Sequence, residues 1–178
     1  MGDLGVGSLK AWTGKASATI VYDSTVDEFT HDGLFDKVKG KGDIALIGFT
    51  ADGDVFGGFY SVAVTRQSRE FYDPSIFAFS FESHGRCHTP QRFAVKQVLK
   101  DKAFVKFVKG SSYGFICFEV YGAGHFLLGN GSSRSNCNSV STAFEGLSDT
   151  TLTGQNNPGM FDNRQYHHCT RLVAVQFS

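Results

Sequence analysis

The sequence has few of the features that mark linkers, membrane spans or surfaces of one charge sign. Only 3 of its 178 residues are proline, and 17 Lys and Arg residues balance 17 Asp and Glu residues. A chain without net charge has no overall field that draws nucleic acid or an anionic membrane, which leaves only local patches. No apolar run approaches the ~18 residues of a membrane-spanning helix, and the N-terminus lacks a basic segment followed by an apolar one. We therefore expect a cytoplasmic protein without membrane insertion.

Cysteine is scarce as well. The 4 cysteines are widely spaced and include no CxxC pair: Cys87, Cys117, Cys137 and Cys169. A chain of this size can bury a core without disulfide bonds, so we expect reduced thiols.

Phenylalanine and glycine are the abundant residues, with 18 and 21 copies. Phenylalanine can build a large core, and many glycines beside few prolines indicate tight turns. The length suits one well-buried domain, which we expect at residues 17–178. Residues 1–16 hold the only tryptophan, Trp12, three positions after Leu9. We expect this lead-in segment to form a short helical turn that docks on the core.

The strongest local signal is the alternating apolar stretch at residues 43–64, which is broken only near Asp52 and Gly53. An Asp-Gly pair between β-prone runs predicts a hairpin with a type I′ turn. In the second arm, Gly57 and Gly58 weaken a strand interior unless another backbone or a bulky ring comes close. We interpret these four residues, two in the turn and two in the strand, as determinants of the fold.

The rest of the chain also reads mainly as strands. Strands are expected at 17–22, 75–82, 113–121, 125–128 and 171–177, with two more inside 92–108 around a turn at 100–102. Phe77, Phe79 and Phe81 line one face of the second of these, which predicts a core strand. A short helix is expected from Thr30, as its cap, to residue 39. The Ser- and Asn-rich stretch 129–158 is expected to be a functional or mobile loop.

Evenly spaced strands outnumber helices, and no helices separate the strands as a parallel sheet requires. The pattern therefore predicts a mainly β (α+β) fold, an antiparallel β-sandwich of two sheets flanked by a few short helices.

Taken in order, these segments resemble the TLDc domain, the module shared by oxidation-resistance proteins and their relatives. Ile20–Ser24, followed by Asp27 and Phe29, is similar to its opening "LLYSxxxDGF", and Asp52–Phe59 is similar to its "DGxVFGGY" hairpin. The other similar segments are Leu34–Val38, Ile76–Phe81, Phe115–Glu119, Asn130–Phe144 and Leu172–Phe177. The resemblance covers most of residues 17–178.

The resemblance implies a sandwich of two antiparallel sheets in an intracellular protein. It also implies a non-enzymatic protein-interaction module that is linked to oxidative-stress protection and binds the vacuolar proton ATPase, with no cofactor. Within the 129–158 loop, the candidate contact residues are Asn130, Ser133, Arg134, Asn136, Cys137 and Asn138.

Two other function classes stay open: a stress enzyme, either thiol-based or metal-dependent, and a nucleic-acid-binding module. A thiol-based stress enzyme would use Cys137, near Arg134 in the polar loop, because an exposed thiol of low pKa reacts with oxidants. A metal-dependent enzyme would use Cys87, His88, His168 and Cys169, which are zinc-ligand types although their spacing matches no short zinc motif. A nucleic-acid-binding module would use a basic strand face that is otherwise a solvated surface, built from Lys96, Lys100, Lys102 and Lys106.

Overall fold

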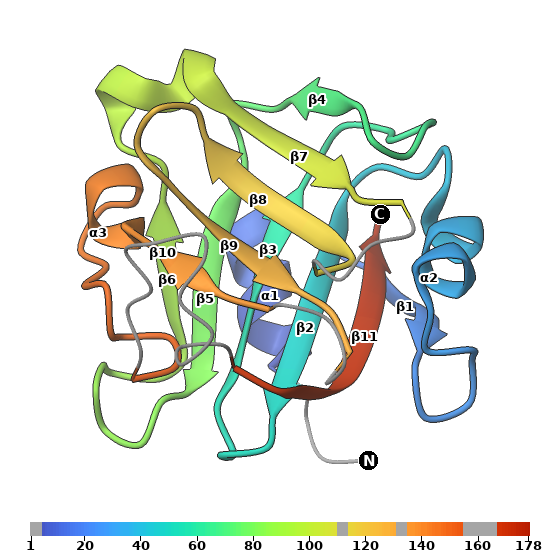
Figure 1. Ribbon diagram of the computed structural model, residues 1–178, viewed down its shortest axis with the longest axis horizontal. Helices are drawn as coiled ribbons and strands as arrows, with labels where there is room; N and C mark the ends of the chain where they lie inside the picture. The colour runs from blue at the N-terminus through green and yellow to red at the C-terminus, as the bar shows by residue number, and fades with distance from the viewer. Residues whose placement is uncertain (1–4, 110–113, 131–134, 155–166) are drawn as a thin grey trace.

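The computed structural model describes residues 5–109, 114–130, 135–154 and 167–178 and shows two antiparallel sheets packed face to face (Figure 1). The predicted β-sandwich is confirmed. The six-stranded sheet has the order β1 (Ala18–Asp23), β11 (Cys169–Phe177), β2 (Ile44–Thr50), β3 (Val55–Tyr60), β5 (Phe77–Glu82) and β6 (Gln91–Ala94). The five-stranded sheet has the order β10 (Cys137–Asn138), β9 (Gly124–Leu128), β8 (Ile116–Val120), β7 (Ala103–Phe107) and β4 (Glu70–Tyr72).

Short helices flank the sheets. They are α1 (Val6–Thr13), α2 (His31–Val38), the 3₁₀ helix η1 (Gln97–Lys102) and α3 (Val140–Ala143). Within the described ranges, none of these helices has the length and apolar character needed to cross a membrane.

The predicted cap of α2 is confirmed. The Thr30 hydroxyl accepts a hydrogen bond from the Gly33 backbone N–H at 3.0 Å. Gly33 is needed there because a Cβ would lie 2.3 Å from the Glu28 carbonyl oxygen. Leu34 and Val38 then point into the core, where both are fully buried.

The central hairpin forms as predicted from β2 and β3, but its turn is of another type. The Gly53 N–H donates to the Thr50 carbonyl oxygen at 3.1 Å, so Ala51 and Asp52 are the central residues. Of these four residues only Gly53 has positive φ, at 91°, whereas a type I′ turn needs it at both central positions. The loop is longer than two residues because the Thr50 hydroxyl accepts the Asp54 N–H at 3.0 Å and holds that residue inside the turn.

The paired glycines of β3 are sites of close approach, as predicted. A Cβ at Gly57 would lie 1.8 Å from the Leu46 carbonyl oxygen, and a Cβ at Gly58 would lie 2.7 Å from the Phe118 ring. Because Phe118 belongs to β8, Gly58 is a point at which the two sheets meet.

Two apolar clusters stabilise the sandwich. The main core lies between the sheets, where Phe118 stacks on Phe126 with ring centroids 4.9 Å apart. The second lies on the opposite face of the six-stranded sheet, which α1 covers from behind in Figure 1. The phenylalanine face of β5 belongs to this second cluster, with the Trp12 ring 6.0 Å from Phe81. The alternation predicted a core strand, but both of its faces are buried.

The structure differs from the expected pattern between β6 and β7. Residues 97–102 form η1 instead of continuing a strand, with the Leu99 N–H donating to the Lys96 carbonyl oxygen at 2.8 Å. Only the second half of 92–108 alternates cleanly, and that half is β7.

Candidate functional site

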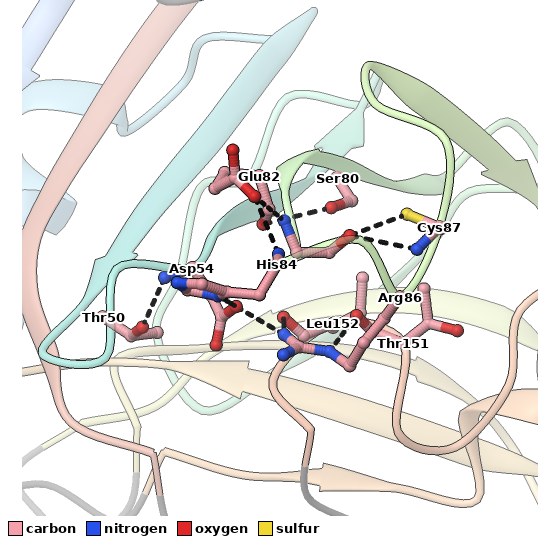
Figure 2. A network of polar contacts seen from close by, with 10 residues as sticks. Thr50, Asp54, Ser80, Glu82, His84, Arg86, Cys87, Thr151 and Leu152 are labelled. Atoms are coloured by element: carbon pink, nitrogen blue, oxygen red, sulfur yellow. Dashed lines mark hydrogen bonds and ion pairs between the residues drawn. The ribbon is translucent and has the colours of Figure 1, made fainter.

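Three segments from distant parts of the chain meet at one end of the sandwich. They are residues 50–54 of the central hairpin, residues 82–90 after β5 and residues 148–154 after α3, and we call them the three-loop end. Asp54, the last residue of the first segment, is buried there with only 1% of its surface exposed and lies beside His84 in Figure 2. A buried carboxylate is costly unless it is paired and hydrogen-bonded, so its partners define this site.

Asp54 has two side-chain partners from the 82–90 loop. Its Oδ1 atom forms an ion pair with Nη2 of Arg86 and accepts from Nδ1 of His84 at 2.9 Å. The Arg86 guanidinium also donates from Nε to the Thr151 carbonyl oxygen at 3.1 Å, and from Nη2 to the Leu152 carbonyl oxygen at 3.2 Å. Arg86 therefore joins all three segments at once, as Figure 2 shows.

The 82–90 loop is also held by its own hydrogen bonds. Oε1 of Glu82 accepts the N–H of His84 at 2.7 Å and that of Ser83 at 2.9 Å, and these bonds lower the pKa of Glu82. The Ser83 hydroxyl accepts the Cys87 N–H at 3.1 Å and lies 3.3 Å from its Sγ atom. His84 adopts a left-handed φ of 51°, which is uncommon outside glycine. The loop is therefore preorganised before anything binds to it.

The tips above this network face solvent. Residues 51–53 of the turn and residues 84–86 and 88–90 of the loop are exposed, and 53% of the His84 side chain is accessible. The arrangement presents an acidic residue, two imidazoles and the edge of a guanidinium on a fixed scaffold. Such rigidly supported loops are where β-sandwiches most often carry binding residues.

The candidate contact residues of the 129–158 loop are placed differently from the prediction. Asn136 and Cys137 are 5% and 3% exposed, so the prediction that they lie in an exposed contact loop is wrong. Asn130 is partly buried and its amide donates to the Phe29 carbonyl oxygen at 3.2 Å, while Asn138 is partly exposed beside β9. Ser133 and Arg134 lie outside the described residues. The stretch is structural because β10 and α3 form within it.

The thiol prediction for Cys137 is corrected for the same reason. Cys137 sits in β10 opposite Phe126, with its side chain in the main core. Burial raises the pKa of this thiol to about 12, whereas a reactive cysteine needs an accessible thiolate. Cys117 and Cys169 are buried too, which leaves the partly exposed Cys87.

The four candidate metal ligands do not assemble. Cys169 is 1% exposed in β11, where burial raises the pKa of its thiol to about 12, and Cys87 is hydrogen-bonded to Ser83. Across the described ranges, no three His, Cys, Asp or Glu side chains gather closely enough to hold a metal ion, so His88 and His168 do not complete a site there.

The basic strand face is divided among several elements. Lys96 precedes η1 and its Nζ donates to the Ser141 carbonyl oxygen at 2.8 Å, whereas Lys100 and Lys102 lie within η1. Only Lys106 is on a strand, β7, opposite Glu70 of β4. The predicted row of lysines on strands is therefore wrong, because residues 97–102 are helical.

The residues that build the three-loop end carried no local signal. Asp54 follows the Asp52–Gly53 turn signal directly, and its partner Arg86 lies 32 residues away in a loop without a motif. His84 stands two residues before Arg86, and that short spacing is the only hint that both face one group. No protein-family model matches the chain, and comparison with curated proteins finds no match either.

Proposed function

We propose that this chain is a non-enzymatic protein-interaction module and that the three-loop end is its contact surface. The observation that carries the proposal is Arg86, which binds the buried Asp54 carboxylate and the carbonyl oxygens of Thr151 and Leu152. This single side chain fixes three segments whose tips stay exposed.

Preorganisation is the physical reason that this geometry suits binding. A loop that must be ordered on binding loses conformational entropy at that moment, which weakens the complex. Here the cost of ordering is met during folding, since the 82–90 loop bonds to itself through Glu82 and Ser83 and to the body through Arg86. The exposed side chains Asp52 and His88 make no part of this network and are therefore available to a partner.

The resemblance to the TLDc domain supports the biological context. It suggests a cytoplasmic protein of the oxidative-stress type, with the vacuolar proton ATPase as the expected partner. The hairpin residues 52–59 carry both the most distinctive part of that resemblance and one of the three segments of the contact surface. The proposal therefore places partner binding beside the most recognisable motif.

A pull-down from native cytosol, quantified by mass spectrometry, tests the proposal. The bait is the full chain, compared with the double variant Asp52→Ala/His88→Ala, which leaves the Asp54 network intact. The matched control is Arg69→Ala, an exposed residue between β3 and β4 at the far end of β3 from the turn.

We expect a stoichiometric protein partner that the double variant loses and the control retains. Purified vacuolar proton ATPase subunits, added to the immobilised chain, then test the expected identity of the partner. Recovery of no stoichiometric partner, or equal recovery by the double variant and the wild type, would contradict the contact surface proposed here.

A further inference from the structure

A polar cleft lies on the outer face of the five-stranded sheet. Glu119 of β8, His125 of β9 and Asn138 of β10 are direct neighbours in the strand register, so they form one row across three strands. Together with Ser139 and the turn at 122–124 they line a cleft of about 320 Å³, which we call the outer cleft. None of its residues belongs to the three-loop end.

Glu119 gives the outer cleft its charge. Glu119 is partly buried, and among the described residues its carboxylate accepts one hydrogen bond, from Sγ of Cys117, 3.8 Å from Oε2. Lys106 lies opposite Cys117 in the register, yet neither it nor any other described residue forms an ion pair with Glu119. A carboxylate that is partly withdrawn from water without a cation favours an incoming positive group.

His125 adds an acceptor beside that carboxylate. Its Nε2 atom lies 3.2 Å from Oδ1 of Asn136, and because an amide oxygen only accepts, Nε2 carries the proton. Burial lowers the pKa of His125, which keeps the ring neutral near pH 7. The other ring nitrogen, Nδ1, is then left with a lone pair.

The backbone around the outer cleft is tightly fitted. A Cβ at Gly124 would lie 2.2 Å from the Ser139 carbonyl oxygen, so only glycine allows β9 to approach the start of α3 this closely. Ser139 itself has a left-handed φ of 48°, and its hydroxyl donates to Oδ1 of Asn138 at 2.8 Å. The close approach fixes Asn138 and Ser139 next to the Glu119–His125 pair.

We propose that the outer cleft binds an alkylammonium or guanidinium group, with Glu119 as the counter-ion and His125 and Asn138 as hydrogen-bond acceptors. The volume lies at the low end for ligand pockets, which suits one cationic head group with a short stem. An anion would be repelled by the Glu119 carboxylate, and a neutral group would leave that carboxylate without a counter-ion. The cation can be a small amine or a Lys or Arg side chain of a protein. The inference is independent of the three-loop end.

NMR titration of the full-length, isotope-labelled chain tests this site. The probes are n-butylammonium and n-butylguanidinium, with n-pentanol as the neutral control. Nα-acetyl-lysine amide and a Lys-containing peptide separate a free amine from a protein side chain. We expect saturable shifts of the His125 ring and of the backbone amides at 119–125 and 138–139 with the cations only. Absence of saturable shifts with both cations, or an equal response to n-pentanol, would overturn the proposal.

Two variants locate the charge that binds. Glu119→Gln keeps the shape of the side chain and removes its charge, so cation binding should weaken by about tenfold or more. Glu145→Gln, at an exposed glutamate outside the cleft, should bind as the wild type does. Equal binding by both variants would refute the role of Glu119. If Glu119→Gln fails to fold, Asn138→Asp decides the question, because a second carboxylate in the row should tighten cation binding. Unchanged or weaker binding by Asn138→Asp would then refute the site.

Discussion

Two aspartate–arginine pairs bind distant segments of this chain, and they do so in different surroundings. At the three-loop end, Asp54 pairs with Arg86 between loops. Toward the opposite edge of the six-stranded sheet, Asp23 at the end of β1 pairs with Arg171 of β11, with Nε 3.0 Å from Oδ1 and Nη2 2.5 Å from Oδ2. The second pair joins strands that are already hydrogen-bonded to each other along their length. The same two residue types therefore have different structural roles in the two pairs.

The difference shows what each arginine adds. Arg171 reinforces a ladder and rests on the Phe49 ring, with its guanidinium carbon 5.1 Å from the ring centroid. Arg86 supplies the contacts to the 148–154 segment from loops that share no ladder with it. Loss of Arg171 should weaken the contact between β1 and β11, which stay paired by their backbone hydrogen bonds. Loss of Arg86 should release the loops of the surface that we propose binds a partner.

The largest effect is expected from Arg86→Ala. It leaves the Asp54 carboxylate buried with His84 as its only side-chain partner among the described residues, which should lower the free energy of unfolding by about 3 kcal/mol. Urea unfolding measures this loss, and hydrogen exchange should show faster opening of residues 82–90 and 148–154. Arg69→Ala is the exposed control. A loss as small as that of the control would mean that the three-loop end is held by other contacts.

The double variant Asp54→Ala/Arg86→Ala tests whether the unpaired Asp54 charge causes the loss of stability in Arg86→Ala. Removal of both partners leaves no unpaired buried charge, so the double variant should be more stable than Arg86→Ala by about 1–2 kcal/mol. The two backbone carbonyls that Arg86 satisfied still lose their donor, so the wild-type stability should not return. A double variant less stable than Arg86→Ala would show that burial of the Asp54 charge is not the dominant cost.

A smaller effect, with a pH signature, is expected from Arg171→Ala. The hydrogen bonds from Arg171 hold the pKa of Asp23 at about 2, below its ordinary value of 3.8. Because the folded-state pKa is lowered, this stabilisation is complete above pH 3.8 and is lost as the pH falls towards 2. Arg171→Ala should cost about 1–2 kcal/mol at neutral pH, since the arginine is partly exposed. Unfolding measured between pH 2 and 6 should then show a shallower acid loss than in the wild type.

Sequence patterns predicted the strands and helices of this fold better than they predicted which other elements each face packs against. The hairpin of β2 and β3, the cap at Thr30 and the strand β11 follow from local alternation, turn residues and capping chemistry, so neighbouring residues suffice to predict them. The side of β5 that faces the second sheet could not be predicted. Both of its faces are apolar, and the choice depends on α1, which lies more than sixty positions earlier in the chain.

The candidate site was harder to predict for a related reason. The stretch after Gly129 is rich in Ser and Asn, yet several of its described polar side chains are hydrogen-bonded internally, as when the Ser135 hydroxyl donates to the Gly129 carbonyl oxygen at 3.3 Å. Burial with internal hydrogen bonds leaves no trace in composition. The pairing of Asp54 with Arg86 likewise depends on tertiary placement.

The smallest effect concerns Cys87, and it distinguishes the two pairs without unfolding the protein. Cys87 is the only one of the four cysteines that is not buried, so a chromogenic aromatic disulfide should label one thiol rapidly in the native chain. Cys87→Ser should abolish that phase. Arg86→Ala loosens the loop that holds Cys87 against Ser83 and should speed the labelling several-fold, while Arg171→Ala, whose pair lies in a strand ladder, should leave the rate unchanged. Equal acceleration by both variants would show that the two pairs contribute alike to the order of the three-loop end, and the contrast between them would fail.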